Sequence, residues 1–67
     1  LDYVSLKYKE LKGLAPVYAN YRQSLEKRGY REILIHAANS RYKKYLHSLG
    51  YTEELADGKT LRKSLVQ

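Results

Sequence analysis

The chain has 67 residues, so it forms one domain at most, spanning residues 1–67. It contains no Cys, which excludes disulfides and thiolate metal sites, and no apolar run approaches the roughly 18 residues of a membrane span. Its 13 Lys and Arg outnumber 7 Asp and Glu, and the net charge of +6 leads us to expect an anionic partner.

The absence of Cys and of a signal-peptide pattern favours an intracellular protein, cytoplasmic or nuclear. The chain begins at Leu1 and has no Met, so we expect a domain excised from a larger protein. A domain of this size buries only about 60% of its unfolded surface. We therefore expect it to borrow stability from a partner, for which a homodimer is a reasonable arrangement.

Gly and Pro residues divide the chain into four segments, each of which we predict to be helical. The first covers residues 2–12, where Leu1, Val4, Tyr8 and Leu11 recur at helical spacing. The same spacing is heptad-like and is also compatible with the end of an upstream coiled coil.

The second predicted helix covers residues 16–28 and ends at Gly29. Its apolar stripe consists of Val17, Tyr18, Tyr21 and Leu25. The fourth covers residues 52–66, where Thr52 is a suitable N-cap and Gly58 weakens the helix by about 1 kcal/mol. This last segment is therefore either one weak helix or two short ones joined near Gly58.

The third predicted helix, residues 30–49, has the strongest pattern. Its apolar arc consists of Leu34, Ile35, Ala38, Tyr42, Tyr45, Leu46 and Leu49. Ile33 falls on the opposite, polar side and is the exception. With no segment assigned to a strand, the sequence predicts an all-α fold, a small bundle of three to four short helices that could pair as a helical dimer.

The polar face of the third predicted helix is the main candidate site. It carries His36, Asn39, Ser40, Lys43, Lys44 and His47. Asn can bond adenine with two hydrogen bonds, Lys and His can reach phosphate or guanine, and a helix carrying such side chains fits the major groove of DNA. An ordinary solvated helix surface has a similar composition.

Further basic residues extend this candidate site. Those that we expect to contact phosphates, beyond the two lysines already named, are Lys27, Arg28, Arg31, Lys59, Arg62 and Lys63. Three of these six lie in residues 26–50, the most basic part of the chain, where six basic and two acidic residues give +4. The leading hypothesis is therefore a nucleic-acid-binding domain, best suited to duplex DNA, whose affinity depends steeply on salt.

The aromatic residues are eight Tyr, with no Trp or Phe. We expect Tyr8, Tyr18, Tyr21, Tyr42 and Tyr45, which lie on the apolar stripes, to pack in the core or in a dimer interface. Tyr3, Tyr30 and Tyr51 lie near the ends of predicted helices and are freer to contact a ligand, for example by stacking on bases.

Two alternative functions remain open at this stage. The runner-up is a protein-interaction or oligomerisation domain of a larger regulatory protein, favoured by the small size and the Tyr-rich stripes. A third is binding to an anionic membrane surface, against which the absence of Trp and Phe argues.

Several kinds of chemistry are not expected of this chain. No residues form a catalytic or metal-ligating pattern, so we expect no enzymatic activity, cofactor, metal or small-molecule substrate. His36 and His47, eleven residues apart, would lie too far apart on one helix to share a metal ion.

Overall fold

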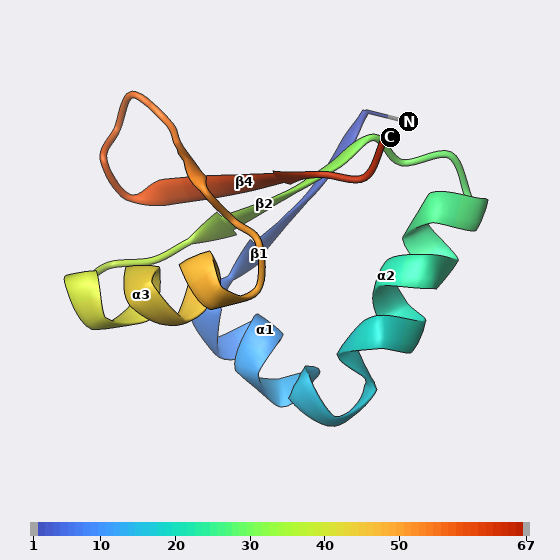
Figure 1. Cartoon of the computed structure of the whole chain (residues 1–67), viewed down its shortest axis with the longest axis horizontal. Helices are drawn as coiled ribbons and strands as arrows, with labels where there is room; N and C mark the ends of the chain where they lie inside the picture. The colour runs from blue at the N-terminus through green and yellow to red at the C-terminus, as the bar shows by residue number, and fades with distance from the viewer. Residues whose placement is uncertain (1, 67) are drawn as a thin grey trace.

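The computed structural model describes residues 2–66 and contains a four-stranded mixed sheet together with helices. The three α-helices lie on the same side of the sheet, so the domain has one β layer and one α layer (Figure 1). The prediction of an all-α helical bundle is therefore wrong, because three of the four predicted helices contain a strand.

The elements follow one another as β1 Tyr3–Lys7, α1 Tyr8–Gly13, the 3-10 helix η1 Ala15–Val17, α2 Tyr18–Lys27, β2 Glu32–His36, α3 Ser40–Ser48, β3 Glu53–Glu54 and β4 Thr60–Ser64. The strand order in the sheet is β1-β2-β4-β3. Strands β1 and β2 are parallel, whereas β4 runs antiparallel to both β2 and β3. Within residues 2–66, no helix combines the length and the apolar character needed to cross a membrane.

Strand β1 occupies the first half of the segment predicted as helix 2–12. Val4 and Leu6 are half-buried and pack against the core, while the side chains between and around them are exposed. This alternation has the period of two that a strand requires. Val4 also fits the helical spacing with Tyr8 and Leu11, so the two periods overlap in the sequence. Leu1, the first member of the predicted stripe, lies outside the described residues.

Strand β2 replaces the first part of the predicted helix 30–49. Ile33 and Ile35 are fully buried, and Leu34 between them is half-buried. The β-branched Ile side chains suit a strand, and a short apolar run cannot be assigned to a helix or a strand from its periodicity alone. Ile33, the exception on the predicted helix, is thus a core residue of the sheet.

The helical part of this segment is limited to α3, whose nine residues span about 14 Å. Asn39 is its N-cap, because the Asn39 Oδ1 accepts a hydrogen bond of 3.0 Å from the Tyr42 backbone N–H. Leu46 is the fully buried residue of α3, and Tyr42, Tyr45 and Leu49 pack against the core around it. The apolar face predicted for this half of the segment is confirmed.

The segment predicted as helix 52–66 is a hairpin of β3 and β4. The chain turns at Asp57 and Gly58, and Gly58 has a φ of +69°, which favours glycine. Leu61 and Leu65 are buried on the helical side of the sheet. The sequence predicted a joint between two helices near Gly58. In the structure this turn instead connects two antiparallel strands.

The carboxylate of Asp57 organises this turn. Its Oδ1 accepts hydrogen bonds from the backbone N–H groups of Lys59 and Thr60, both at 2.9 Å, and its Oδ2 accepts one from the Thr60 hydroxyl at 2.7 Å. These bonds favour the charged carboxylate and lower the pKa of Asp57 to about 2.

We predict that the Asp57 carboxyl titrates near pH 2 in the folded protein, as NMR of its side-chain carbonyl would measure. This pKa lies below the ordinary value of 3.8, so the charged Asp57 carboxylate stabilises the folded protein. Its contribution to the free energy of unfolding is complete above pH 4 and is lost as the pH falls towards 2. In Asp57→Asn, this part of the acid destabilisation should disappear. A carboxyl that titrates near pH 4 would contradict the observed turn.

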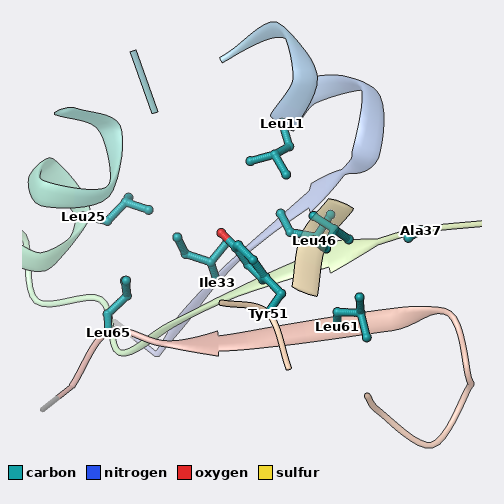
Figure 2. Close-up of a cluster of buried hydrophobic side chains, with 9 residues drawn as sticks. Leu11, Leu25, Ile33, Ala37, Leu46, Tyr51, Leu61 and Leu65 are labelled. Atoms are coloured by element: carbon teal, nitrogen blue, oxygen red, sulfur yellow. The ribbon is translucent and has the colours of Figure 1, made fainter. Parts of the chain in front are cut away.

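The core lies between the sheet and the helices. Its buried residues are Leu11, Leu25, Ile33, Ile35, Ala37, Leu46, Tyr51, Leu61 and Leu65. Figure 2 shows the Tyr51 ring among these aliphatic side chains. Tyr51 has no exposed surface, so the expectation that it is free to contact a ligand is wrong. Tyr8, Tyr18, Tyr21, Tyr42 and Tyr45 pack against the core, as their positions on apolar stripes predicted.

Candidate nucleic-acid interface

The polar residues expected on one face of a long helix are distributed over β2, α3 and the loop between them. His36 is exposed at the end of β2, and Asn39 is engaged in capping α3. Ser40, Lys44 and His47 are exposed on α3. Their predicted common face is therefore reduced to the short exposed side of α3.

Two of the predicted lysines form contacts within the domain. Lys43 of α3 forms a salt bridge of 2.6 Å with Glu54 of β3. Lys63 of β4 reaches the end of α3, where its Nζ donates a hydrogen bond of 3.1 Å to the Leu49 backbone oxygen. A cation at this place is favourable because it meets the negative end of the helix dipole.

The remaining predicted residues lie elsewhere. Lys27 and Arg28 end α2, and the exposed Arg31 precedes β2, at the end of the domain opposite α3 (Figure 1). Lys59 is exposed in the turn before β4.

Arg62 of β4 belongs to an ion-pair network. It forms salt bridges with Glu32 at 2.9 Å and with Glu53 at 2.6 Å. These pairs leave Arg62 with little net charge to offer to a phosphate. The twelve predicted residues thus do not form one surface.

The structure places a different set of basic residues around a groove between α1 and α3, which we call the α1–α3 groove. It has a volume of about 480 Å³ and is lined by Tyr8, Lys9, Lys12, Arg41, Tyr42 and Tyr45. Its residues come from two segments that are far apart in the sequence, so neither segment alone reveals it.

The sheet topology positions this groove. The neighbouring parallel strands β1 and β2 end at the same edge of the sheet. Helix α1 starts directly after β1, and α3 starts shortly after β2, so the two helices begin at this edge (Figure 1). Crevices beyond the carboxyl ends of parallel strands are the usual place for ligands in open α/β sheets.

The wall of the α1–α3 groove is aromatic. The rings of Tyr8 and Tyr42 are stacked, with centroids 3.8 Å apart and an interplanar angle of 7°. Tyr45 meets Tyr8 edge-on, with centroids 6.1 Å apart and an angle of 83°. Such contacts hold the rings in fixed orientations, which makes them a preformed platform for another planar group.

The rim of the α1–α3 groove is cationic. Lys9, Lys12 and Arg41 are exposed, and within residues 2–66 none of the three forms a salt bridge. The Lys12 Nζ lies 5.8 Å from the centroid of the Tyr45 ring, within cation–π range. The groove therefore combines free positive charge with aromatic surface.

A second cavity, which we call the inner pocket, adjoins the α1–α3 groove at Tyr45. It has a volume of about 250 Å³ and is lined by Leu11, Ala15, Tyr18, Ala19, Tyr45 and Leu49. The lining is mostly apolar. Two of the lining residues, Tyr18 and Tyr45, carry a hydroxyl, and that of Tyr18 lies 2.6 Å from the hydroxyl of the buried Tyr51. Burial raises the pKa of Tyr18 and Tyr51 above the ordinary value of 10.0, so both hydroxyls are protonated at neutral pH.

The sequence prediction missed Lys9, Lys12 and Arg41 as binding residues, and it assigned the groove tyrosines to packing alone. A usable signal was the presence of both aromatic and basic residues within the short segments 8–12 and 41–45. Their proximity was not visible, because it depends on the parallel pairing of β1 with β2.

Neither a metal site nor a similarity to known proteins indicates a function for this chain. Among residues 2–66, no three His, Asp or Glu side chains gather as they would around a metal ion. No protein-family model, curated protein or solved structure matches the chain.

Proposed function

We propose that this domain binds single-stranded nucleic acid in the α1–α3 groove. The observation that carries the proposal is the combination of three tyrosine rings with three exposed cations in one cavity of about 480 Å³. Proteins that bind single strands use the same combination, since bases stack on aromatic rings while a basic groove follows the phosphates.

Each part of the groove has a defined role in this proposal. Lys9, Lys12 and Arg41 bind phosphate oxygens, and unpaired bases stack on the rings of Tyr42 and Tyr45. The groove contains no array of amide side chains with which to read base edges. We therefore expect weak sequence preference and a strong dependence of the affinity on salt.

A single strand fits this surface better than the duplex DNA of the sequence-based hypothesis. That hypothesis depended on a recognition helix of about 30 Å, whereas α3 has nine residues and buries Leu46 against the sheet. Asn39, which with Ser40 was expected to contact bases, already accepts a hydrogen bond from the Tyr42 backbone N–H. In duplex DNA the bases are paired and stacked on one another, so they cannot stack on the tyrosines.

Fluorescence anisotropy with a labelled mixed-sequence single strand tests this proposal, with the corresponding duplex in parallel at low and physiological salt. We expect micromolar or tighter binding of the single strand at low salt, weakening as salt rises, and weaker binding of the duplex. Absence of single-strand binding at low salt would overturn the proposal.

The contribution of stacking is tested with Tyr42→Leu. We expect the affinity for the single strand to fall about tenfold, since stacking contributes about 1–3 kcal/mol per base. Tyr3→Leu is the matched control, because Tyr3 is 55% exposed on β1 and does not line the groove. Equal effects of the two substitutions would argue against stacking on Tyr42.

A second candidate function, self-association, is favoured by the edge of the sheet. Within residues 2–66, β1 pairs with β2 alone and contains no proline, so its other edge offers free backbone groups. Antiparallel pairing with a second copy around Ser5 would place Val4 opposite Leu6. Sedimentation velocity over a range of concentrations tests this, and a monomer at every concentration would contradict it.

A further inference from the structure

The inner pocket lies beside the α1–α3 groove, is lined by residues at or next to α1, α2 and α3, and shares the side chain of Tyr45 with the groove. Tyr45 lines both cavities, so a ligand held at the cationic rim can extend past this ring into the inner pocket. Ala15 and Ala19 contribute to the opening because their side chains are small, and both residues are exposed. The two cavities thus differ in character: the outer one is charged and aromatic, and the inner one is mainly apolar.

The hydroxyl pair beside the inner pocket has an unused hydrogen-bond donor. Tyr18 and Tyr51 share one hydrogen bond of 2.6 Å, in which either oxygen can be the donor. One of the two hydroxyl protons forms this bond, and within residues 2–66 the other has no hydrogen-bond acceptor. Tyr51 is fully buried, whereas Tyr18 lines the pocket, so the arrangement in which Tyr51 donates leaves the Tyr18 O–H for a ligand. A ligand atom with a lone pair in the inner pocket can accept this unused proton.

We propose that the inner pocket takes a nucleobase of the bound strand, whose carbonyl or ring nitrogen accepts a hydrogen bond from the Tyr18 hydroxyl. This inference rests on the proposed function, because the phosphate of the same nucleotide lies on the cations of the α1–α3 groove. Apolar walls cover the faces of the base, and the single donor satisfies an atom on its edge.

Charge complementarity favours a nucleobase over an apolar side chain or a lipid tail. A purely apolar occupant would leave the Tyr18 O–H without an acceptor and would not use Lys9, Lys12 or Arg41. A nucleotide satisfies both the cations and the Tyr18 hydroxyl, because its phosphate is anionic and its base carries hydrogen-bond acceptors. A volume of about 250 Å³ is small for a ligand site, which favours one ring system over a larger group.

Two substitutions test the pocket without changing the cations. Ala19→Leu fills the inner pocket from an exposed position of α2, and Tyr18→Phe removes the donor. Affinities are measured for a short single strand and for the same strand with abasic sites. We expect Ala19→Leu to weaken binding of the intact strand about tenfold and Tyr18→Phe to weaken it about fivefold, while binding of the abasic strand stays unchanged. Ala56→Leu, the same change at an exposed position between β3 and β4, is the matched control.

A titration of the unaltered protein provides a second measurement. Adenosine 5′-monophosphate should shift the amide NMR signals of both Lys12 and Ala19, whereas ribose 5-phosphate should shift that of Lys12 alone. Equal shifts of Ala19 with both compounds would overturn the base assignment. If both pocket variants bind the intact strand as tightly as the unaltered protein, the inner pocket is not a base site, while the proposed function stands. If the unaltered protein binds no single strand, the proposed function itself fails.

Discussion

Replacing Ile33 by alanine should unfold most of the protein at 25 °C. Ile33 has no exposed surface and lies on β2, a central strand of the sheet with β1 on one side and β4 on the other. Truncation of a buried Ile costs about 2–5 kcal/mol, because it removes transfer free energy and leaves a cavity. The hydrophobic core of a domain of this size rarely supplies more than about 3–5 kcal/mol of stability, so the expected loss is comparable to the whole.

Urea unfolding followed by circular dichroism measures this effect, with Leu34→Ala as the control. Leu34 is the next residue along β2 and faces the open side of the sheet, where it is half-buried. We expect a clearly smaller loss of stability for Leu34→Ala. The predicted helix over residues 30–49 gives the opposite order, because there Leu34 faces the core and Ile33 does not. A larger effect at Leu34 would therefore contradict the sheet.

Removing the three cations of the α1–α3 groove should cause the largest loss of nucleic-acid affinity. We predict that the triple variant Lys9→Gln, Lys12→Gln, Arg41→Gln binds the single strand up to about 100-fold more weakly, since exposed ion pairs contribute at most about 1 kcal/mol each. The slope of log affinity against log salt should become less steep by about 2, because each phosphate contact to a single strand contributes about 0.7. Anisotropy titrations at several salt concentrations measure both quantities.

The matched control removes the same charge from the opposite end of the domain. The triple variant Lys27→Gln, Arg28→Gln, Arg31→Gln lowers the net charge equally, and the sequence-based hypothesis placed these residues on phosphates. We expect this control to retain most of its affinity and its salt slope. Equal losses in both variants would indicate that net charge alone causes the binding. A larger loss in the control would favour the originally predicted surface.

The sequence by itself determined the parts of the fold that depend on local interactions. Helix α2 lies inside its predicted bounds of 16–28, starting two residues later and ending one residue earlier, because Pro16 and Gly29 flank it and its stripe has helical spacing. Gly29 and Gly50 follow α2 and α3 with φ angles of +89° and +98°, as expected of residues that end helices. The inward face of α3 was predicted for the same reason. These features depend on neighbouring residues within a few turns.

Only the tertiary structure decided the strands. Val4 and Leu6 face Ile33 and Ile35 across the β1–β2 pair, and Leu61 faces Ile35 from β4. Each strand is only two to five residues long and becomes stable through hydrogen bonds and packing with segments distant in the chain. The spacing of apolar residues within one segment cannot indicate pairing with a distant segment. Apolar residues that also fit a helical spacing were therefore assigned to helices.

The candidate site shows the same division. Local sequence identified a basic chain and an exposed polar side of α3, but it could not say which cations form pairs. Lys43 pairs with Glu54, Arg62 pairs with two glutamates, and Lys63 donates a hydrogen bond to the end of α3. The fold of the sheet brings these groups close together. Lys9, Lys12 and Arg41 stay exposed, and they meet because parallel strands end at one edge and each continues into a helix there. Charge is a property of the sequence, whereas the place where it remains free is set by the contacts of the folded chain.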